Sequence, residues 1–148
     1  MMMPWQLARR LETAGVLGMN RRNGDFVLPC NPRRLYPLVD DKLQTKELAH
    51  KAGLAVPELY AAFRFSGEVR QARSVLDKHQ NFVLKPANGS RGNGILVIKG
   101  RAGDKLRLGS HRLMDWDDLR FHMQNTLSGI YSLGGQEDSV LAEYCVEF

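Results

Sequence analysis

Cysteine is scarce in this chain, because only Cys30 and Cys145 occur among its 148 residues. The two thiols are far apart and show no Cys-x-x-Cys spacing. This excludes a disulfide framework and gives no indication of a cysteine zinc site. Scattered free thiols are typical of a reducing compartment, and the sequence therefore predicts a cytoplasmic protein.

Long apolar runs, internal repeats and low-complexity tracts are also missing. No segment approaches the roughly 18 apolar residues that a membrane-spanning helix needs, and the N-terminus lacks the apolar core of a secretory signal. Apolar residues make up 43% of the chain and charged residues 25%, which is typical of a globular domain. We therefore expect a folded chain with no membrane partner.

Acidic residues are in deficit, with 16 Asp and Glu against 21 Lys and Arg, which gives a net charge of +5. A basic balance suits an anionic partner, because the protein's field attracts negative charge. A nucleotide, a nucleic acid and an acidic polymer all meet this condition. Composition alone does not choose among them.

Helix and turn signals divide the first half of the chain. Pro4 suits the first position of a helix, and the carboxylates of Asp40 and Asp41 suit the positive end of another. Asn and Gly are typical of turns, and prolines interrupt regular structure. The expected elements are a helix from residue 4, a turn over 20–25, an irregular proline-rich connector to residue 37, a helix over 40–53 with Leu43, Leu48 and Ala52 buried, a strand within 54–63 and a helix over 69–79.

Apolar runs of strand length dominate the second half. The expected elements are a strand over 82–86, a glycine-rich loop over 87–94, a strand over 95–98, a hairpin over 100–109, a helix over 115–127, a loop over 133–138 and a strand over 140–146. The fold class predicted from this order is α+β, with a helical N-terminal lobe and a small antiparallel β lobe.

The loop between the strands at 82–86 and 95–98 has the composition of a phosphate site. Lys85 ends a buried strand, which holds its positive charge rigidly. Glycines at 89, 92 and 94 let backbone N–H groups approach phosphate oxygens. The loop joins strand to strand, whereas the P-loop and the dinucleotide-binding loop both open a helix. A plain β-hairpin with a glycine-rich turn remains the alternative from this segment alone.

A second element, in a fixed order before the loop, makes the pattern more specific. Its motifs are Asp41-Lys42 with Thr45-Lys46, then 53–60 (GLAVPELY), 82–86 (FVLKP), 90–95 (SRGNGI) and 140–144 (VLAEY). In this order they resemble the N-terminal part of an ATP-grasp carboxylate–amine ligase. Residues 31–42 (NPRRLYPLVDDK) make the chain most similar to the α-L-glutamate ligase-related group, the RimK type.

The resemblance implies a site for ATP and Mg²⁺. Lys42 would contact the α-phosphate and Lys85 the α- and β-phosphates and the purine edge. The loop would lie over the β- and γ-phosphates, and a hinge after the last strand would meet adenine, mostly through its backbone. The residues implied for the loop are Asn88, Gly89, Ser90, Arg91, Gly92, Asn93 and Gly94, and those for the hinge are Glu143, Tyr144 and Cys145.

The resemblance also implies an incomplete module. The Mg²⁺ carboxylates of such ligases lie beyond the hinge, so we expect no metal ligands in this chain, no known catalytic residue and no turnover from it alone. The carboxylate and amine substrates would belong to the full-length enzymes. We expect a partition into 1–37, 38–79 and 80–148, and self-association, because the faces of 140–146 and 95–98 would be left exposed.

A basic binding module without catalysis is the alternative from another class of protein. The pairs Arg9-Arg10, Arg21-Arg22 and Arg33-Arg34 could contact nucleic acid or an acidic polymer. No aromatic side chains are interleaved with them to stack on bases, so nucleic acid is the less favoured partner. The four histidines share no spacing typical of metal ligands, and we expect surface or capping roles for them.

Overall fold

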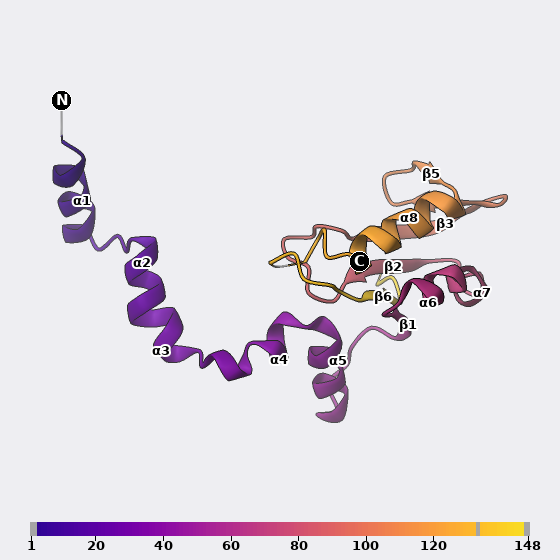
Figure 1. Cartoon of the computed structure of the whole chain (residues 1–148), viewed down its shortest axis with the longest axis horizontal. Coiled ribbons are helices and arrows are strands. Elements are labelled where there is room, and N and C mark those ends of the chain that lie inside the picture. Colours follow the sequence, from indigo (N-terminus) through magenta and orange to yellow (C-terminus); the bar gives the residue numbers. More distant parts are fainter. Residues whose placement is uncertain (1–2, 133, 147–148) are drawn as a thin grey trace. The chain divides into compact units, whose positions relative to one another are not determined.

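The computed structural model describes residues 3–132 and 134–146. The chain divides into two compact units, Met1–Val39 and Asp40–Phe148. Leu133, the first residue of the loop expected over 133–138, lies outside the described residues. Figure 1 shows the helices and strands of each unit.

The N-terminal unit is a succession of short helices in which no residue from 3 to 39 is buried. Its elements are α1 (Pro4–Thr13), α2 (Met19–Arg21), the π-helix η1 (Arg22–Val27), α3 (Leu28–Cys30), the 3-10 helix η2 (Arg33–Leu35) and α4 (Pro37–Asp40). The predicted turn at 20–25 is wrong, because these residues are helical. Arg21 in this helical segment forms ion pairs with Glu12 and Asp25. The irregular connector is also wrong, because Pro29 and Pro37 lie in first helical turns, where proline is tolerated.

Helix α5 (Lys42–Lys51) begins the second unit as the sequence predicts. The Asp41 carboxylate caps it, accepting hydrogen bonds from the backbone N–H groups of Leu43 and Gln44. The burial predicted for Leu48 and Ala52 is wrong, because both are exposed. This helix is therefore held mainly by polar contacts. Every helix in the described ranges is too short or too polar to span a bilayer.

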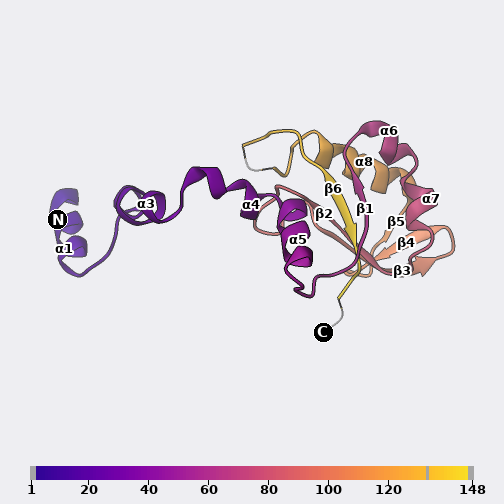
Figure 2. The same cartoon turned by 90° about the horizontal axis from the view of Figure 1, so that it is seen from below.

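A six-stranded antiparallel sheet forms the centre of the second unit, in the order β1-β6-β2-β3-β4-β5 (Figure 2). Its strands are β1 (Leu59–Phe63), β2 (Phe82–Pro86), β3 (Leu96–Ala102), β4 (Lys105–Leu108), β5 (Leu113–Met114) and β6 (Val140–Glu143). The short strand β5 was not predicted. The predicted α+β class is confirmed, and the sheet with its helices is consistent with a partial ATP-grasp domain.

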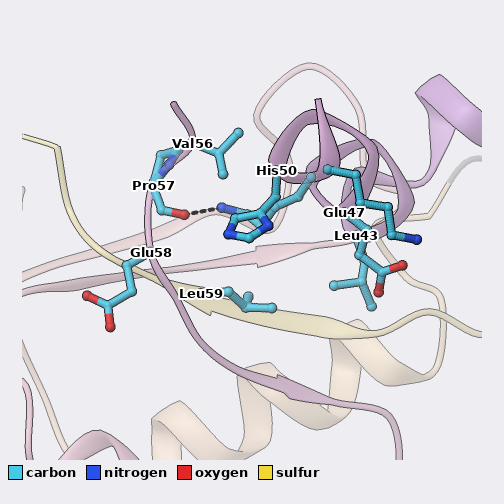
Figure 3. Close-up of a pocket in the computed structure, with 9 residues that line it drawn as sticks. Leu43, Glu47, His50, Val56, Pro57, Glu58 and Leu59 are labelled. Carbon is cyan, nitrogen blue, oxygen red and sulfur yellow. Dashed lines mark hydrogen bonds between the residues drawn. The ribbon is translucent and has the colours of Figure 1, made fainter. Parts of the chain in front are cut away.

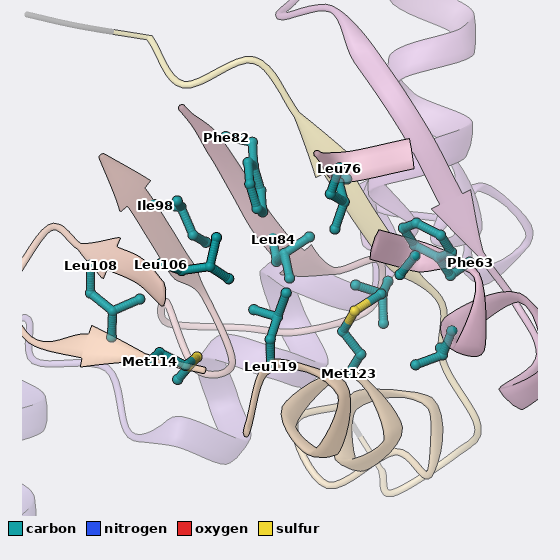
Figure 4. Packing of buried hydrophobic residues seen from close by; sticks show 14 residues of the cluster. Phe63, Leu76, Phe82, Leu84, Ile98, Leu106, Leu108, Met114, Leu119 and Met123 are labelled. Atoms are coloured by element: carbon teal, nitrogen blue, oxygen red, sulfur yellow. The ribbon is translucent and has the colours of Figure 1, made fainter. Parts of the chain in front are cut away.

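One face of the sheet carries the hydrophobic core, covered by α6 (Ser66–Arg70), α7 (Ala72–Leu76) and α8 (Trp116–Leu127). In Figure 4, Leu119 and Met123 of α8 point toward Leu84 of β2. The single helix predicted over 69–79 is instead two helices, which begin earlier because the Glu68 carboxylate accepts from the N–H groups of Arg64 and Phe65.

Strand β6 lies inside the sheet, between β1 and β2, and not at an edge. It ends at Glu143, and all four of its residues are buried. The exposure expected for the faces of 140–146 and 95–98 is therefore wrong for β6 and for Ile98, which are buried, whereas Tyr144, Val146 and Ile95 are exposed as expected. Within the described residues the edge strands are β1 and β5, and any self-association through an edge would have to use them.

Truncating Leu119 tests this core. Leu119→Ala removes a side chain with no exposed area, so we expect a loss of about 2–5 kcal/mol in the free energy of unfolding. Phe121→Ala on the same helix is the control, because Phe121 is 68% exposed and its truncation should cost only about 0.5 kcal/mol. Urea denaturation measures both, and equal losses would contradict this placement of α8.

Candidate functional site

The sheet face opposite the core carries the charged residues of the candidate site. Leu84 pairs with Ala142 across β2 and β6, and both point into the core. Successive side chains of a strand point to opposite faces. Lys85 and Glu143, their neighbours in sequence, therefore lie together on the other face, as strand alternation alone requires.

The Glu143 carboxylate is held between two lysine ammonium groups. Lys85 Nζ lies 2.6 Å from Oε2, and Lys46 Nζ lies 3.2 Å from Oε1. The Glu143 side chain is only 3% exposed, so its charge needs these partners. The contact of Lys46 with Oε1 is an ion pair without hydrogen-bond geometry. Within the described residues no other group donates a hydrogen bond to Oε1. Sequence reasoning assigned no role to Lys46.

Lys42, at the start of α5, lies against the loop that the sequence paired it with. Its Nζ donates to the carbonyls of Ala87 and Gly89, and its backbone N–H donates to Ala87 at 3.0 Å. Burial lowers the pKa of Lys42 below its ordinary value, with the charge of Lys85 acting in the same direction and that of Asp138 opposing it. The two lysines expected to contact phosphate are thus close enough to influence each other.

The glycine-rich loop joins β2 to β3, which are antiparallel neighbours paired from Phe82↔Ile98 to Leu84↔Leu96. Residues 91–94 form turns and β3 starts at Leu96, so no helix begins there and a P-loop is excluded. Two of the glycines are required by local packing. A Cβ at Gly89 would lie 2.2 Å from Pro86 Cγ, and one at Gly94 would lie 2.6 Å from the Tyr131 ring.

Asp138 fixes the first end of the loop. Its carboxylate accepts from the backbone N–H of Asn88 at 3.0 Å, from Asn88 Nδ2 at 2.9 Å and from the N–H of Ser139 at 2.7 Å. The Asn88 side chain is therefore committed to this contact at the base of the loop. Sequence reasoning missed Asp138 as a site residue, because 50 residues separate it from Asn88 along the chain.

His122 of α8 fixes the second end of the loop. Its Nε2 lies 2.9 Å from the carbonyl oxygen of Gly94, and its Nδ1 lies 3.4 Å from the Tyr131 hydroxyl. Burial lowers the pKa of His122 below 6.5, partly opposed by the hydrogen bond to Gly94. The neutral ring can donate to the carbonyl through Nε2 and accept from Tyr131 through Nδ1. The expected surface role for this histidine is wrong.

The hinge residues that follow β6 are only partly as expected. The backbone N–H of Tyr144 donates to the Glu58 carbonyl at 2.8 Å, so it is already used. The Glu143 side chain is turned to the two lysines. Cys145 is buried, whereas Tyr144 is 48% exposed. Backbone contacts to an adenine ring would therefore have to avoid the Tyr144 N–H group.

Two cavities border the site without containing its lysine pair, Lys42 and Lys85. The first, of about 530 Å³, lies between α5 and the segment before β1 (Figure 3). Its lining includes Leu43, Val56 and Pro57, whose carbonyl accepts a hydrogen bond from Lys46. The second, of about 570 Å³, is lined in part by Asn88 and Asp138. Neither cavity by itself is the expected phosphate site.

The described residues do not fit a Mg²⁺ site. Over 3–132 and 134–146, no three His, Cys, Asp or Glu side chains gather in a way that could hold a metal ion. The two buried carboxylates near the lysines are already committed, Glu143 to Lys85 and Lys46, and Asp138 to Asn88.

An antiparallel six-stranded sheet backed by helices, with lysines beside a glycine-rich loop, is consistent with part of an ATP-grasp domain. The chain belongs to the family described as sugar-transfer associated ATP-grasp, whose model matches residues 21–148. This confirms the predicted superfamily and supports an ATP-dependent, ligase-like function; the resemblance to the RimK type stays a prediction. No curated protein and no solved structure matches the chain.

Replacing Asp138 tests the first fixed end of the loop. Three N–H groups point at its carboxylate; an asparagine would remove the negative charge that they face and would put an NH₂ donor where Oδ2 accepts from the Asn88 N–H. We expect Asp138→Asn to cost about 1–3 kcal/mol of stability and to speed hydrogen exchange at the amides of Asn88 and Ser139. The exposed neighbour gives the control, Glu137→Gln, which should leave both unchanged. Unchanged hydrogen exchange at these two amides in Asp138→Asn would show that the Asp138 carboxylate does not hold this end of the loop.

The His122 contact predicts a pH dependence of stability. Because the folded-state pKa of His122 is lowered, its contribution is fully present above about pH 6.5 and is lost as the pH falls below that value, where the unfolded chain takes up the proton first. In His122→Gln the amide can still donate to Gly94 but does not titrate. Urea denaturation from about pH 8 to pH 5.5 should show the wild-type advantage shrinking with acid, and a constant difference would contradict this.

Proposed function

We propose that this chain supplies the ATP-binding part of an ATP-dependent carboxylate–amine ligase of the α-L-glutamate ligase-related type. In this reaction a substrate carboxylate attacks the γ-phosphate of ATP. The bond from the γ-phosphorus to the bridging oxygen breaks, leaving ADP and an acyl phosphate. An amine then attacks the acyl carbon and phosphate leaves, which forms the amide. Mg²⁺ would neutralise phosphate charge when bound.

The observation that carries the proposal is the meeting of Lys42, Lys85 and the glycine-rich loop at one end of β2. Lys42 touches the loop's first carbonyls, and Lys85 precedes the loop on the strand. Two ammonium groups beside a glycine-rich loop have the charge that suits a polyphosphate. The family match over residues 21–148 supports a nucleotide as the source of that phosphate.

The tip of the loop is proposed as a lid over the β- and γ-phosphates. Arg91, Gly92 and Asn93 are exposed, while the two ends of the loop are fixed by Asp138 and His122. Fixed ends with an exposed tip allow the tip to move without disturbing the sheet. Ordering of the tip when nucleotide binds is part of this proposal.

Turnover is not expected from these residues alone. No described cluster of carboxylates can hold Mg²⁺, so the charge that develops on the transferring phosphoryl group would not be neutralised. Among the described residues we assign no metal ligand and no residue that binds the carboxylate or the amine. The chain would then bind ATP weakly and leave it intact.

A basic binding module is the second candidate, and one observation favours it. The three arginine pairs of the N-terminal unit are all exposed, in a segment where no described residue is buried. Binding to nucleic acid through them would weaken steeply as salt is added, because phosphate contacts release counterions. Titrations with an ATP analogue and with nucleic acid can distinguish a nucleotide site in the second unit from a binding surface made by these arginine pairs.

Calorimetric titration with a non-hydrolysable ATP analogue tests the proposed site. We expect a dissociation constant of about 1 µM to 1 mM for the wild type. In Lys85→Ala one charge-assisted phosphate contact is lost, about 1.5–3 kcal/mol, which weakens binding roughly 10- to 150-fold. The control is Lys78→Ala, an exposed lysine between α7 and β2, which should bind as the wild type does.

Three results would contradict the proposal in different ways. The same isotherm for wild type and Lys85→Ala would remove Lys85 from the nucleotide site. Amine-dependent release of ADP by the wild-type chain would show that it holds a complete catalytic centre. Salt-sensitive binding of nucleic acid, with no binding of the analogue, would favour the basic module.

A further inference from the structure

The cluster around Glu143 has more positive than negative charge. Two ammonium groups, of Lys46 and Lys85, meet one carboxylate, so one positive charge is left uncompensated. A buried carboxylate with a single lysine would hold that lysine firmly, because losing it would leave a bare charge in the interior. A second lysine removes this constraint.

The two lysines are not equivalent. The Lys46 side chain is 11% exposed, and its ammonium also donates to the Pro57 carbonyl, which ties it to the chain before β1. The Lys85 side chain is 24% exposed, and Glu143 is the partner that the structure shows for its ammonium. Lys46 is thus the fixed member of the pair and Lys85 the one that can turn toward solvent or a ligand.

We propose that Lys46 is a positioning residue that keeps Glu143 neutralised, so that Lys85 can leave the carboxylate and bind nucleotide phosphate. This inference rests on the proposed ATP site. Without Lys46, phosphate would have to compete with a buried carboxylate for the ammonium of Lys85. With Lys46 in place, Lys85 moves from one anion to another and no bare charge is left behind.

A cycle of two substitutions separates this role from simple support of the fold. Lys46→Met keeps an unbranched side chain that is one atom shorter and removes its charge, which leaves Glu143 holding Lys85. We expect binding of the non-hydrolysable ATP analogue to weaken about tenfold. Adding Glu143→Gln to Lys46→Met removes the competing charge, and affinity should return to within about threefold of the wild type.

The two possible roles of Lys46, neutralising Glu143 and supporting the fold, predict different affinities of the double variant for the ATP analogue. If Lys46 only supports the fold, the double variant binds as weakly as Lys46→Met or more weakly, and the inference is overturned. It is also overturned if Lys46→Met binds like the wild type while Lys85→Ala does not. Wild-type protein that binds no analogue refutes the proposed function itself, and the inference with it.

Controls keep the test valid if Lys46→Met is unstable. Far-UV circular dichroism and thermal melting check that each variant folds. Lys51→Met, an exposed lysine on the same helix, should bind as the wild type does. Lys46→Arg keeps the charge and should retain binding. Glu143→Gln alone should bind at least as tightly as the wild type, because it frees Lys85, and a loss of affinity would overturn the inference.

Discussion

The second unit is organised around one buried negative charge. Glu143 ends β6, a strand inside the sheet, and its carboxylate has almost no contact with water. Such a group is stable only beside opposite charge, which Lys85 from β2 and Lys46 from α5 supply. Helix α5 buries none of its residues completely, and this ion pair is one of the few contacts that hold it. The arrangement of Lys42 beside the loop follows, because Lys42 lies one turn earlier on the same helix.

The loop that approaches phosphate combines two fixed ends with an exposed tip. At one end an acidic side chain gathers three N–H groups, and at the other a neutral imidazole holds a carbonyl. Both anchoring residues lie on elements that pack against the core or lead directly into β6. The position of the tip therefore depends on the sheet and α8, while its own residues stay free of packing demands. Because the ends of the loop are already fixed, a ligand has to order only the tip, which lowers the entropic cost of binding.

Local signals in the sequence were sufficient for the elements that carry the lysines. The carboxylate of Asp41 at the start of α5, the strand over 82–86 and the helix over 115–127 each depend on a few adjacent residues, and each of these predictions is confirmed. Three features depend on distant parts of the chain: the central place of β6, the ion pair of Lys46, and the contact of Asp138 with Asn88. No local pattern encodes them. The helices at 19–30 were missed for another reason, since Asn, Gly and Pro are typical of turns yet are tolerated in short helical segments.

The strand order also constrains when the sheet can form. Strands β1 and β2 do not pair with each other, and the strand between them is β6, made from residues 140–143. During synthesis the ribosome releases β1, β2 and the β3–β4 hairpin well before it has made β6. The hairpin of β2 and β3 can pair early, whereas β1 waits without a partner until the middle strand emerges. Closure of the sheet is thus a late, long-range event, and such events slow folding because a large loop must be closed first.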